Sequence, residues 1–204
     1  MKGKFITLEG PDGSGKSTIL KLLEKHFINE NIPHIITREP GGTKIGEDIR
    51  EIILSNDNHN MGAETEALLY AAARGQHVHE RIKPSLKEGK HVLCDRFLLS
   101  SLAYQGVGRN LGIDKVKYIN EFGIKELKPD LILFFHVNPE VTLLRKTSKG
   151  GDRLEKEGND FHNRVYNGYM QLIKLFPENI AIVDASKNIE EVLEQTISQI
   201  KKIL

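Results

Sequence analysis

Five short runs of mainly apolar, often β-branched residues recur along the chain, each bounded by glycine or polar residues. We expect each run to form a strand, and the runs are Phe5–Glu9, His34–Thr37, His91–Asp95, Leu131–Val137 and Ile180–Asp184. Apolar residues follow one another in these runs instead of alternating with polar ones. Such runs indicate strands that are covered on both faces.

Amphipathic segments separate the strand runs. The segment after the first run carries Ile19, Leu20, Leu22, Leu23 and Phe27 on one broad face, and the chain ends in the periodic stretch IEEVLEQTISQIKKIL. Strands that alternate with helices predict an α/β three-layer sandwich, with about five parallel strands and helices on both faces of the sheet. Ligands bind such sheets at the carboxyl ends of the strands, so residues that follow strands are the first candidates for a site.

The first strand run leads into GPDGSGKST, which has the spacing of a phosphate-binding P-loop between a strand and a helix. Glycines let successive backbone N–H groups turn toward a phosphate, and the helix that follows points its positive end at the same place. We expect Lys16 to reach the β- and γ-phosphates of a nucleoside triphosphate, and Ser17 to bind Mg²⁺. The candidate residues for this triphosphate are Gly10, Pro11, Asp12, Gly13, Ser14, Gly15, Lys16, Ser17 and Thr18.

A P-loop leaves open whether the phosphate passes to water, as in a switch protein, or to a second substrate, as in a kinase. The Asn-Lys-x-Asp run that reads guanine is absent from the sequence. Cationic and aromatic residues after the later strands have no evident task in a switch. They favour a kinase, while a nucleotide-dependent switch or binding protein remains the alternative from another class.

The second strand run leads into TREPGGT, and Arg50 lies on the segment that follows it. Tyr70 and Arg74 are four residues apart, so they share one face of a predicted helix. An aromatic ring beside a guanidinium suits a base stacked on the ring and a phosphate held beside it. The alternative is an exposed arginine on an amphipathic helix with a half-buried tyrosine.

The third strand run leads into DRFLLSSLAYQG. Asp95 and Arg96 are expected at the ligand edge of the sheet, where Asp95 can position Mg²⁺ and Arg96 can hold an acceptor phosphate in line with the γ-phosphate. The amide of Gln105 can pair with the edge of a pyrimidine, and Tyr104 can close off the sugar.

The stretches EGPDGSGKST, TREPGG, DRFLLSSLAYQG and KPDLILF, in this order and spacing from about Phe5 to Ala185, resemble the thymidylate kinase family. The resemblance implies a P-loop kinase that uses ATP and Mg²⁺ to convert dTMP to dTDP, and it implies a homodimer. Another nucleoside monophosphate kinase is the alternative among kinases.

The resemblance also implies roles in the dTMP site. Asp12 would contact the sugar 3′-hydroxyl near the transferring phosphate, Glu39 and Arg50 would lie in the monophosphate site, and Tyr104 would crowd the 2′ position. Tyr70, where the family usually has phenylalanine, would stack on thymine. Arg74 would bond the thymine edge, and Ser101 and Gln105 would complete the recognition of the base.

The loop interior holds no cation beyond Lys16, so a further positive charge must come from elsewhere. The glycine-rich, charged segment TSKGGDRLEKEGND, about residues 147–160, is typical of a solvated loop or a mobile lid. It resembles the branch of the family that carries its catalytic arginine in the lid. On that basis we expect Arg153 to be this residue, Lys149 to assist it and Arg145 to stack on adenine. The candidate catalytic residues are therefore Asp12, Lys16, Arg96 and Arg153.

Length and charge add few constraints. The 204 residues suit a single kinase domain, 1–204, with the lid at about 147–160, and a net charge of +1 gives no indication of nucleic acid or a membrane as a partner. The N-terminal residues lack the apolar core of a secretion signal, so we expect a cytoplasmic protein. Cys94 is expected in the core. His77 and His79 are expected to be solvated, and the histidines predict no metal site.

Overall fold

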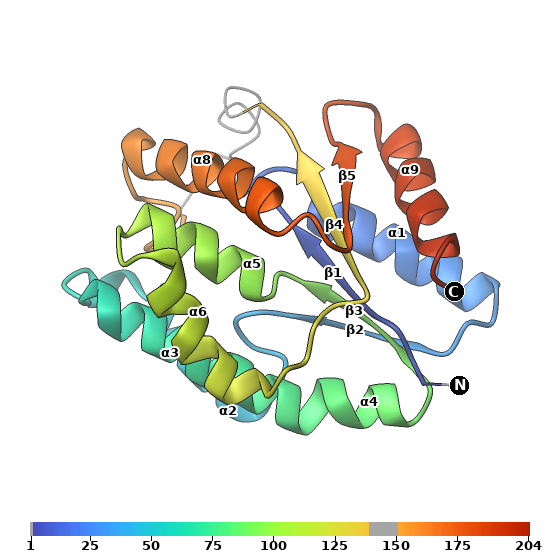
Figure 1. Ribbon diagram of the computed structural model, residues 1–204, viewed down its shortest axis with the longest axis horizontal. Coiled ribbons are helices and arrows are strands. Elements are labelled where there is room, and N and C mark those ends of the chain that lie inside the picture. Colours follow the sequence, from blue (N-terminus) through green and yellow to red (C-terminus); the bar gives the residue numbers. More distant parts are fainter. Residues whose placement is uncertain (1, 139–150) are drawn as a thin grey trace.

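The computed structural model describes residues 2–138 and 151–204. Five parallel strands form one sheet in the order β2-β3-β1-β4-β5, so β1 is central (Figure 1). The strands are β1 Phe5–Glu9, β2 His34–Arg38, β3 His91–Asp95, β4 Leu131–His136 and β5 Ile180–Asp184. All five predicted strands are confirmed. The second runs one residue further than predicted, and the fourth ends one residue earlier.

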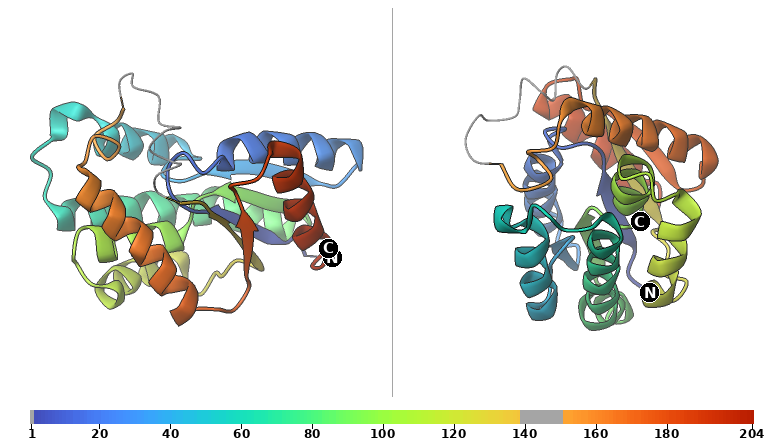
Figure 2. Two further views of the ribbon diagram at one scale, coloured as in Figure 1. Left: turned by 90° about the horizontal axis from the view of Figure 1, so that it is seen from above. Right: turned by 90° about the vertical axis from the view of Figure 1, so that its left-hand side faces the viewer.

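Helices cover both faces of the sheet, as the α/β sandwich prediction requires. Helices α1 and α9 pack together on one face, and α5, α6 and α8 lie on the other (Figure 1 and Figure 2). The α-helices are α1 Lys16–Asn29, α2 Lys44–Leu54, α3 Ala63–His77, α4 Lys83–Lys87, α5 Leu98–Ser101, α6 Ile113–Ile124, α8 Asn159–Leu175 and α9 Ile189–Lys201. Shorter helical segments are η1 Asn56–Asn58, η2 Val78–Ile82 and η3 Leu102–Gly108, of which η2 and η3 have the wider π-helical turn. None of the helices in the described residues is long and apolar enough to cross a membrane.

Side chains of successive residues in the central strands pack into two different hydrophobic clusters, one on each face of the sheet. Leu133 and Phe135 of β4 pack with α1 and α9, whereas Phe134 between them packs with α5, η3 and α8. This alternation follows from the two-residue repeat of a strand, and it explains why the strand runs are apolar at almost every position. Cys94 of β3 is fully buried in a third apolar cluster, which confirms the expectation that it is a core residue.

The register of the sheet brings the ends of three strands together. Leu8 of β1 and Arg38 of β2 both pair with Asp95 of β3. The segments that follow these strands therefore leave the sheet at one edge. Ligands bind at this edge in open parallel sheets. The P-loop and the segments TREPGGT and DRFLLSSLAYQG all lie there.

Leu23 offers a direct test of the helix-on-sheet core. It is fully buried against the sheet, whereas Ile28 on the same helix α1 is 60% exposed. We expect Leu23→Ala to lower the free energy of unfolding by about 2–5 kcal/mol, because it leaves a cavity in the core. The matched change Ile28→Ala should cost less than about 1 kcal/mol. Urea denaturation followed by circular dichroism measures both values, and equal losses would contradict this packing.

Candidate active site

The P-loop links β1 to α1 and closes around the side chain of Lys16. Gly10 has a φ of 140°, and a Cβ atom there would lie 2.8 Å from the carbonyl oxygen of Phe135, so a glycine is needed for the close approach. Lys16 Nζ donates to the carbonyl oxygens of Gly10 and Pro11, at 3.0 and 2.8 Å, and to Ser14 Oγ at 3.2 Å. Burial lowers the pKa of Lys16 to about 8. The ammonium group is thus held inside the loop, where a phosphate would meet it.

Ser17 and Asp95 form the oxygen pair predicted for Mg²⁺. Ser17 Oγ donates a 2.8 Å hydrogen bond to Asp95 Oδ2. Asp95 Oδ1 is buried and has no hydrogen-bond partner among the described residues. A carboxylate oxygen left without a donor beside a hydroxyl suits a hard cation that binds oxygen ligands, so these two residues fit Mg²⁺.

Arg96 joins the P-loop to the end of β3. Its φ of 71° lies in the left-handed region, which is uncommon for a residue with a side chain and recurs at functional sites. Nη1 donates to Gly10 O, Ser100 Oγ and Tyr169 Oη at 3.0–3.1 Å. Nη2 donates to Asp12 Oδ1 at 2.6 Å and to Tyr104 Oη at 3.3 Å. These five contacts fix the guanidinium beside the loop.

Asp12 is the carboxylate partner of Arg96. Its second oxygen, Oδ2, accepts a 2.7 Å hydrogen bond from Tyr104 Oη. Burial raises the pKa of Asp12, but the positive charges of Arg96 and Lys16 outweigh burial and hold the pKa well below its usual range. Asp12 is therefore ionised at neutral pH, between two cations.

A cavity next to this ion pair holds all the residues predicted for dTMP. Its walls include Asp12, Glu39, Arg50, Tyr70, Arg74, Arg96, Ser101, Tyr104 and Gln105. Tyr104 and Gln105 come from the π-helical η3, and Arg50 Nη1 donates to the carbonyl oxygen of Pro40 at 2.9 Å. We call this cavity the acceptor pocket.

A second cavity runs along the P-loop from Asp12 to Ile19, and we call it the donor pocket. Ala185, Lys187 and Ile189, which follow β5, also line it and were missed in the sequence. The rule that ligands bind at strand ends could have found them. The two pockets share Asp12, Ser17, Asp95, Arg96 and Glu155, so they meet at the ion pair and the candidate metal ligands.

Arg74 is buried, so the alternative of an exposed arginine is wrong. Its side chain is 2% exposed, and Nε donates to Glu39 Oε2 at 2.6 Å. Nη1 bonds Ser101 Oγ and Asn120 Oδ1, and Nη2 bonds the carbonyl oxygen of Phe97. Arg74 thus enters the acceptor pocket as a fixed donor.

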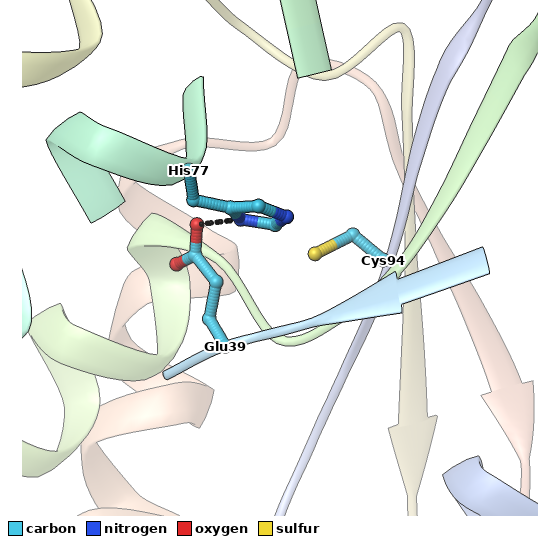
Figure 3. A group of neighbouring side chains, drawn as sticks. All are labelled: Glu39, His77 and Cys94. Atoms are coloured by element: carbon cyan, nitrogen blue, oxygen red, sulfur yellow. Dashed lines mark hydrogen bonds and ion pairs between the residues drawn. The ribbon is translucent and has the colours of Figure 1, made fainter. Parts of the chain in front are cut away.

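His77 is also buried, so the expectation that it is solvated is wrong. It lies three residues after Arg74 on the face of α3 that packs inward, and it is 0% exposed. Its Nδ1 pairs with Glu39 Oε1 at 2.9 Å (Figure 3). Its Nε2 lies 2.7 Å from Thr37 Oγ1. His79 is exposed, as expected. The missed signal was the helix face that His77 shares with Arg74.

Glu39, His77 and Cys94 lie close enough to hold a metal ion, with one ligand atom of each within 4.8 Å of the others (Figure 3). Both carboxylate oxygens of Glu39 and both ring nitrogens of His77 already have partners. The thiol of Cys94 donates to the carbonyl oxygen of Arg96 at 3.0 Å. Within the trio, His77 therefore supports Glu39 by a hydrogen bond at the wall of the acceptor pocket.

Arg153 does not bond the P-loop in this structure, and its catalytic role stays a prediction. Its Nε donates to the carbonyl oxygen of Ile53 at 3.0 Å, and its Nη2 donates to Glu66 Oε2 at 2.7 Å. The segment around it lies beside the end of α2 and the start of α3 (Figure 2). Among the described residues, Arg96 is the arginine that bonds the loop. Arg145 and Lys149 lie outside the described residues.

The described part of the predicted lid is partly buried. Leu154 packs into the core next to α8, and α8 already begins at Asn159, before the predicted end of the lid at Asp160. A single apolar residue among charges was too weak a signal to indicate this docking.

Comparison with known proteins shows similarity along nearly the whole chain. The family model described as "Thymidylate kinase" matches residues 8–196. The thymidylate kinase of Finegoldia magna is 57% identical over 199 residues, which cover 97% of this chain and 98% of that protein. Those of Clostridium novyi and Bacillus velezensis are 51% and 48% identical, over 95% and 100% of this chain and 96% and 98% of their own. The chain belongs to the thymidylate kinase family.

Proposed function

We propose that the protein transfers the γ-phosphate of ATP to dTMP, giving dTDP and ADP, with Mg²⁺ as the metal. The observation that carries this proposal is the junction of two pockets at Asp12, Asp95 and Arg96. One pocket is built on a P-loop, and the other is lined by donors and rings suited to a nucleotide. A switch protein that passes phosphate to water has no need of the second pocket.

On the donor side, the backbone N–H groups of the loop and the ammonium group of Lys16 hold the β- and γ-phosphates. Ser17 and Asp95 hold the metal, which when bound neutralises charge on these phosphates. An oxygen of the dTMP phosphate then forms a bond to the γ-phosphorus, and the bond from that phosphorus to the β,γ-bridging oxygen breaks. The electron pair of this bond leaves with ADP.

Arg96 supplies the cation that the loop lacks. It lines both pockets, and five hydrogen bonds hold its guanidinium in place before any substrate arrives. A donor fixed in this way stabilises developing charge without reorganising during the reaction. Asp12 completes the ion pair and faces the sugar end of the acceptor.

On the acceptor side, Arg50 and Glu39 form the phosphate end of the pocket, and Tyr104 closes the 2′ side of the sugar. Tyr70 stacks on thymine, while Arg74, Ser101 and Gln105 read its edge. We further propose that residues 1–204 form one kinase domain in which residues 147–160 are a lid. Arg145, which precedes this segment, would cover adenine. Lys149 in the segment would approach the phosphates, and Arg153 would anchor it.

The first experiment is a panel of acceptors. ADP release from ATP and Mg²⁺ is measured with dTMP, dUMP, UMP, dCMP or AMP, and with no acceptor. We expect the largest rate with dTMP. If no acceptor raises the rate above that of the blank, the protein is not a kinase for these substrates. If another monophosphate gives a higher rate than dTMP, the protein is a kinase for that monophosphate instead.

Arg96→Lys tests the proposed cation. We expect kcat to fall by about 10²–10³-fold, because an ammonium group cannot keep five fixed contacts and still face the phosphate. Steady-state ADP release measures kcat, and fluorescence titration checks that ATP still binds. The matched change Arg81→Lys, at an exposed arginine, should leave kcat unchanged. Equal rates for Arg96→Lys and the wild type would remove Arg96 from the chemistry.

The lowered pKa of Lys16 predicts how ATP affinity depends on pH. Lys16 is cationic below its pKa of about 8 and neutral above it in the free protein. Bound phosphate favours the charged form, so ATP binding above pH 8 requires the uptake of a proton. We expect the Kd for ATP to rise about tenfold from pH 7 to pH 9, as measured by calorimetry. Lys16→Met should bind more weakly and lose this dependence, and a flat profile in the wild type would contradict the assignment.

We also propose a homodimer formed through α3 and α6. These neighbouring helices expose large apolar side chains, among them Leu68 at 55%, Tyr118 at 78% and Phe122 at 91%. Exposed apolar groups that gather on adjacent helices are typical of an interface between subunits.

Phe122→Glu tests the dimer. A charge at the centre of this surface should convert a dimer of about twice the 23.0 kDa chain mass to a monomer, as measured by light scattering after size exclusion. Ile28→Glu, on the exposed side of α1, is the matched control and should leave the mass unchanged. A wild-type protein that elutes as a monomer at all concentrations would contradict the proposal.

A further inference from the structure

A buried carboxylate lies directly behind the base end of the acceptor pocket. Glu66 is 0% exposed, and it precedes Tyr70 and Arg74 by four and eight residues on α3. The three residues therefore lie along one face of the helix. Tyr70 and Arg74 line the pocket, and Glu66 contacts a third lining residue, Gln105.

Four donors surround the carboxylate. Glu66 Oε1 accepts from Gln105 Nε2 at 2.8 Å and from Arg109 Nε at 3.2 Å. Glu66 Oε2 accepts from Arg109 Nη2 at 3.0 Å and from Arg153 Nη2 at 2.7 Å. A carboxylate offers about four acceptor sites, so these bonds use its capacity in full.

This environment keeps Glu66 ionised. Burial raises its pKa, but hydrogen bonds from Arg109, Gln105 and Arg153 outweigh burial and lower the pKa below its ordinary value. An ionised carboxylate accepts hydrogen bonds and donates none. Gln105 must therefore turn its NH₂ group toward Glu66, which leaves its carbonyl oxygen as the end available to a ligand.

A carbonyl oxygen in this position distinguishes pyrimidines. N3 of thymine or uracil carries a hydrogen and donates to it, whereas N3 of cytosine is an acceptor and is repelled. Arg74 also favours thymine over cytosine. Its four hydrogen bonds use Nε, both N–H groups of Nη1 and one of Nη2, so one N–H of Nη2 remains. That donor suits the O4 oxygen of thymine and opposes the amino group of cytosine.

We propose that Glu66 is a positioning residue that sets base specificity by holding the amide of Gln105 in one orientation, with its carbonyl oxygen toward the base. The inference rests on the proposed transfer of phosphate to dTMP and deepens it. Arg109 and Arg153 keep Glu66 charged, and Arg153 also ties residues 151–157 to the carboxylate that orients the base-reading amide.

The decisive variant is Glu66→Gln. Arg109 and Arg153 favour the carbonyl oxygen of the new amide, so its NH₂ group faces Gln105. Gln105 then turns over and presents its own NH₂ group to the base, which fits N3 of cytosine. We expect the ratio of kcat/KM for dTMP to that for dCMP to fall at least about tenfold. Glu64→Gln, at an exposed glutamate on the same helix, is the matched control and should keep the ratio.

A double-mutant cycle separates this role from general support of the fold. In a Gln105→Met background no amide remains to be oriented, so adding Glu66→Gln should leave the dTMP-to-dCMP ratio unchanged. An equal fall of the ratio in both backgrounds would overturn the inference. So would a loss of activity toward both substrates with no change in the ratio.

Glu66→Asp keeps an acceptor-only carboxylate and serves as the conservative rescue. Its ratio should stay within about threefold of the wild type even where kcat/KM falls, and a collapse of the ratio would overturn the inference. This arm decides the question if Glu66→Gln does not fold, as judged by circular dichroism. A wild-type protein without dTMP-dependent ADP release would defeat the proposed function itself. A selective wild type with a selective, folded Glu66→Gln variant would defeat only the inference.

Discussion

The ion pair between Arg96 and Asp12 is the contact on which the site depends. Asp12 lies in the P-loop and Arg96 follows β3, so the pair closes the gap between two neighbouring strand ends. The same two residues line both pockets, and their charges set the electrostatics there. The register of β1 and β3 places the pair, and the left-handed backbone at Arg96 turns its side chain back onto the loop. Sheet geometry therefore fixes the position of the positive charge that the two pockets share.

A second layer of buried groups holds the polar walls in place. Glu9, fully buried at the end of β1, accepts from the backbone N–H of Phe97 and from Ser100 Oγ, and Ser100 in turn bonds Arg96. Burial raises the pKa of Glu9, while Ser100 and Arg96 counter that effect. Glu39 in the same way holds the wall of the acceptor pocket in place through its hydrogen bonds with Arg74 and His77. Each of these buried groups restricts the rotation of a side chain that lines a pocket.

The sequence was informative wherever neighbours along the chain are neighbours in space. The strands and the P-loop could be read from short patterns, whereas the set of nine acceptor residues was implied by the resemblance to the thymidylate kinase family. The positions of Arg153 and Tyr169 could not be read in this way. Arg153 bonds Glu66 and Tyr169 bonds Arg96, at separations of 87 and 73 residues. Only the folded arrangement brings these partners together, and no local spacing encodes it.

The two faces of helix α3 have different neighbours, and for this reason dilution of the protein can affect its binding pocket. Its inward face carries Tyr70 and Arg74, while Leu68 on the outward face belongs to the proposed contact with a second subunit. Association would stiffen the helix that shapes the pocket, so nucleotide affinity and self-association are linked by mass action. If the proposed dimer forms, substrate binding would therefore depend on protein concentration, and the abundance of the protein in a cell would affect its own catalytic efficiency.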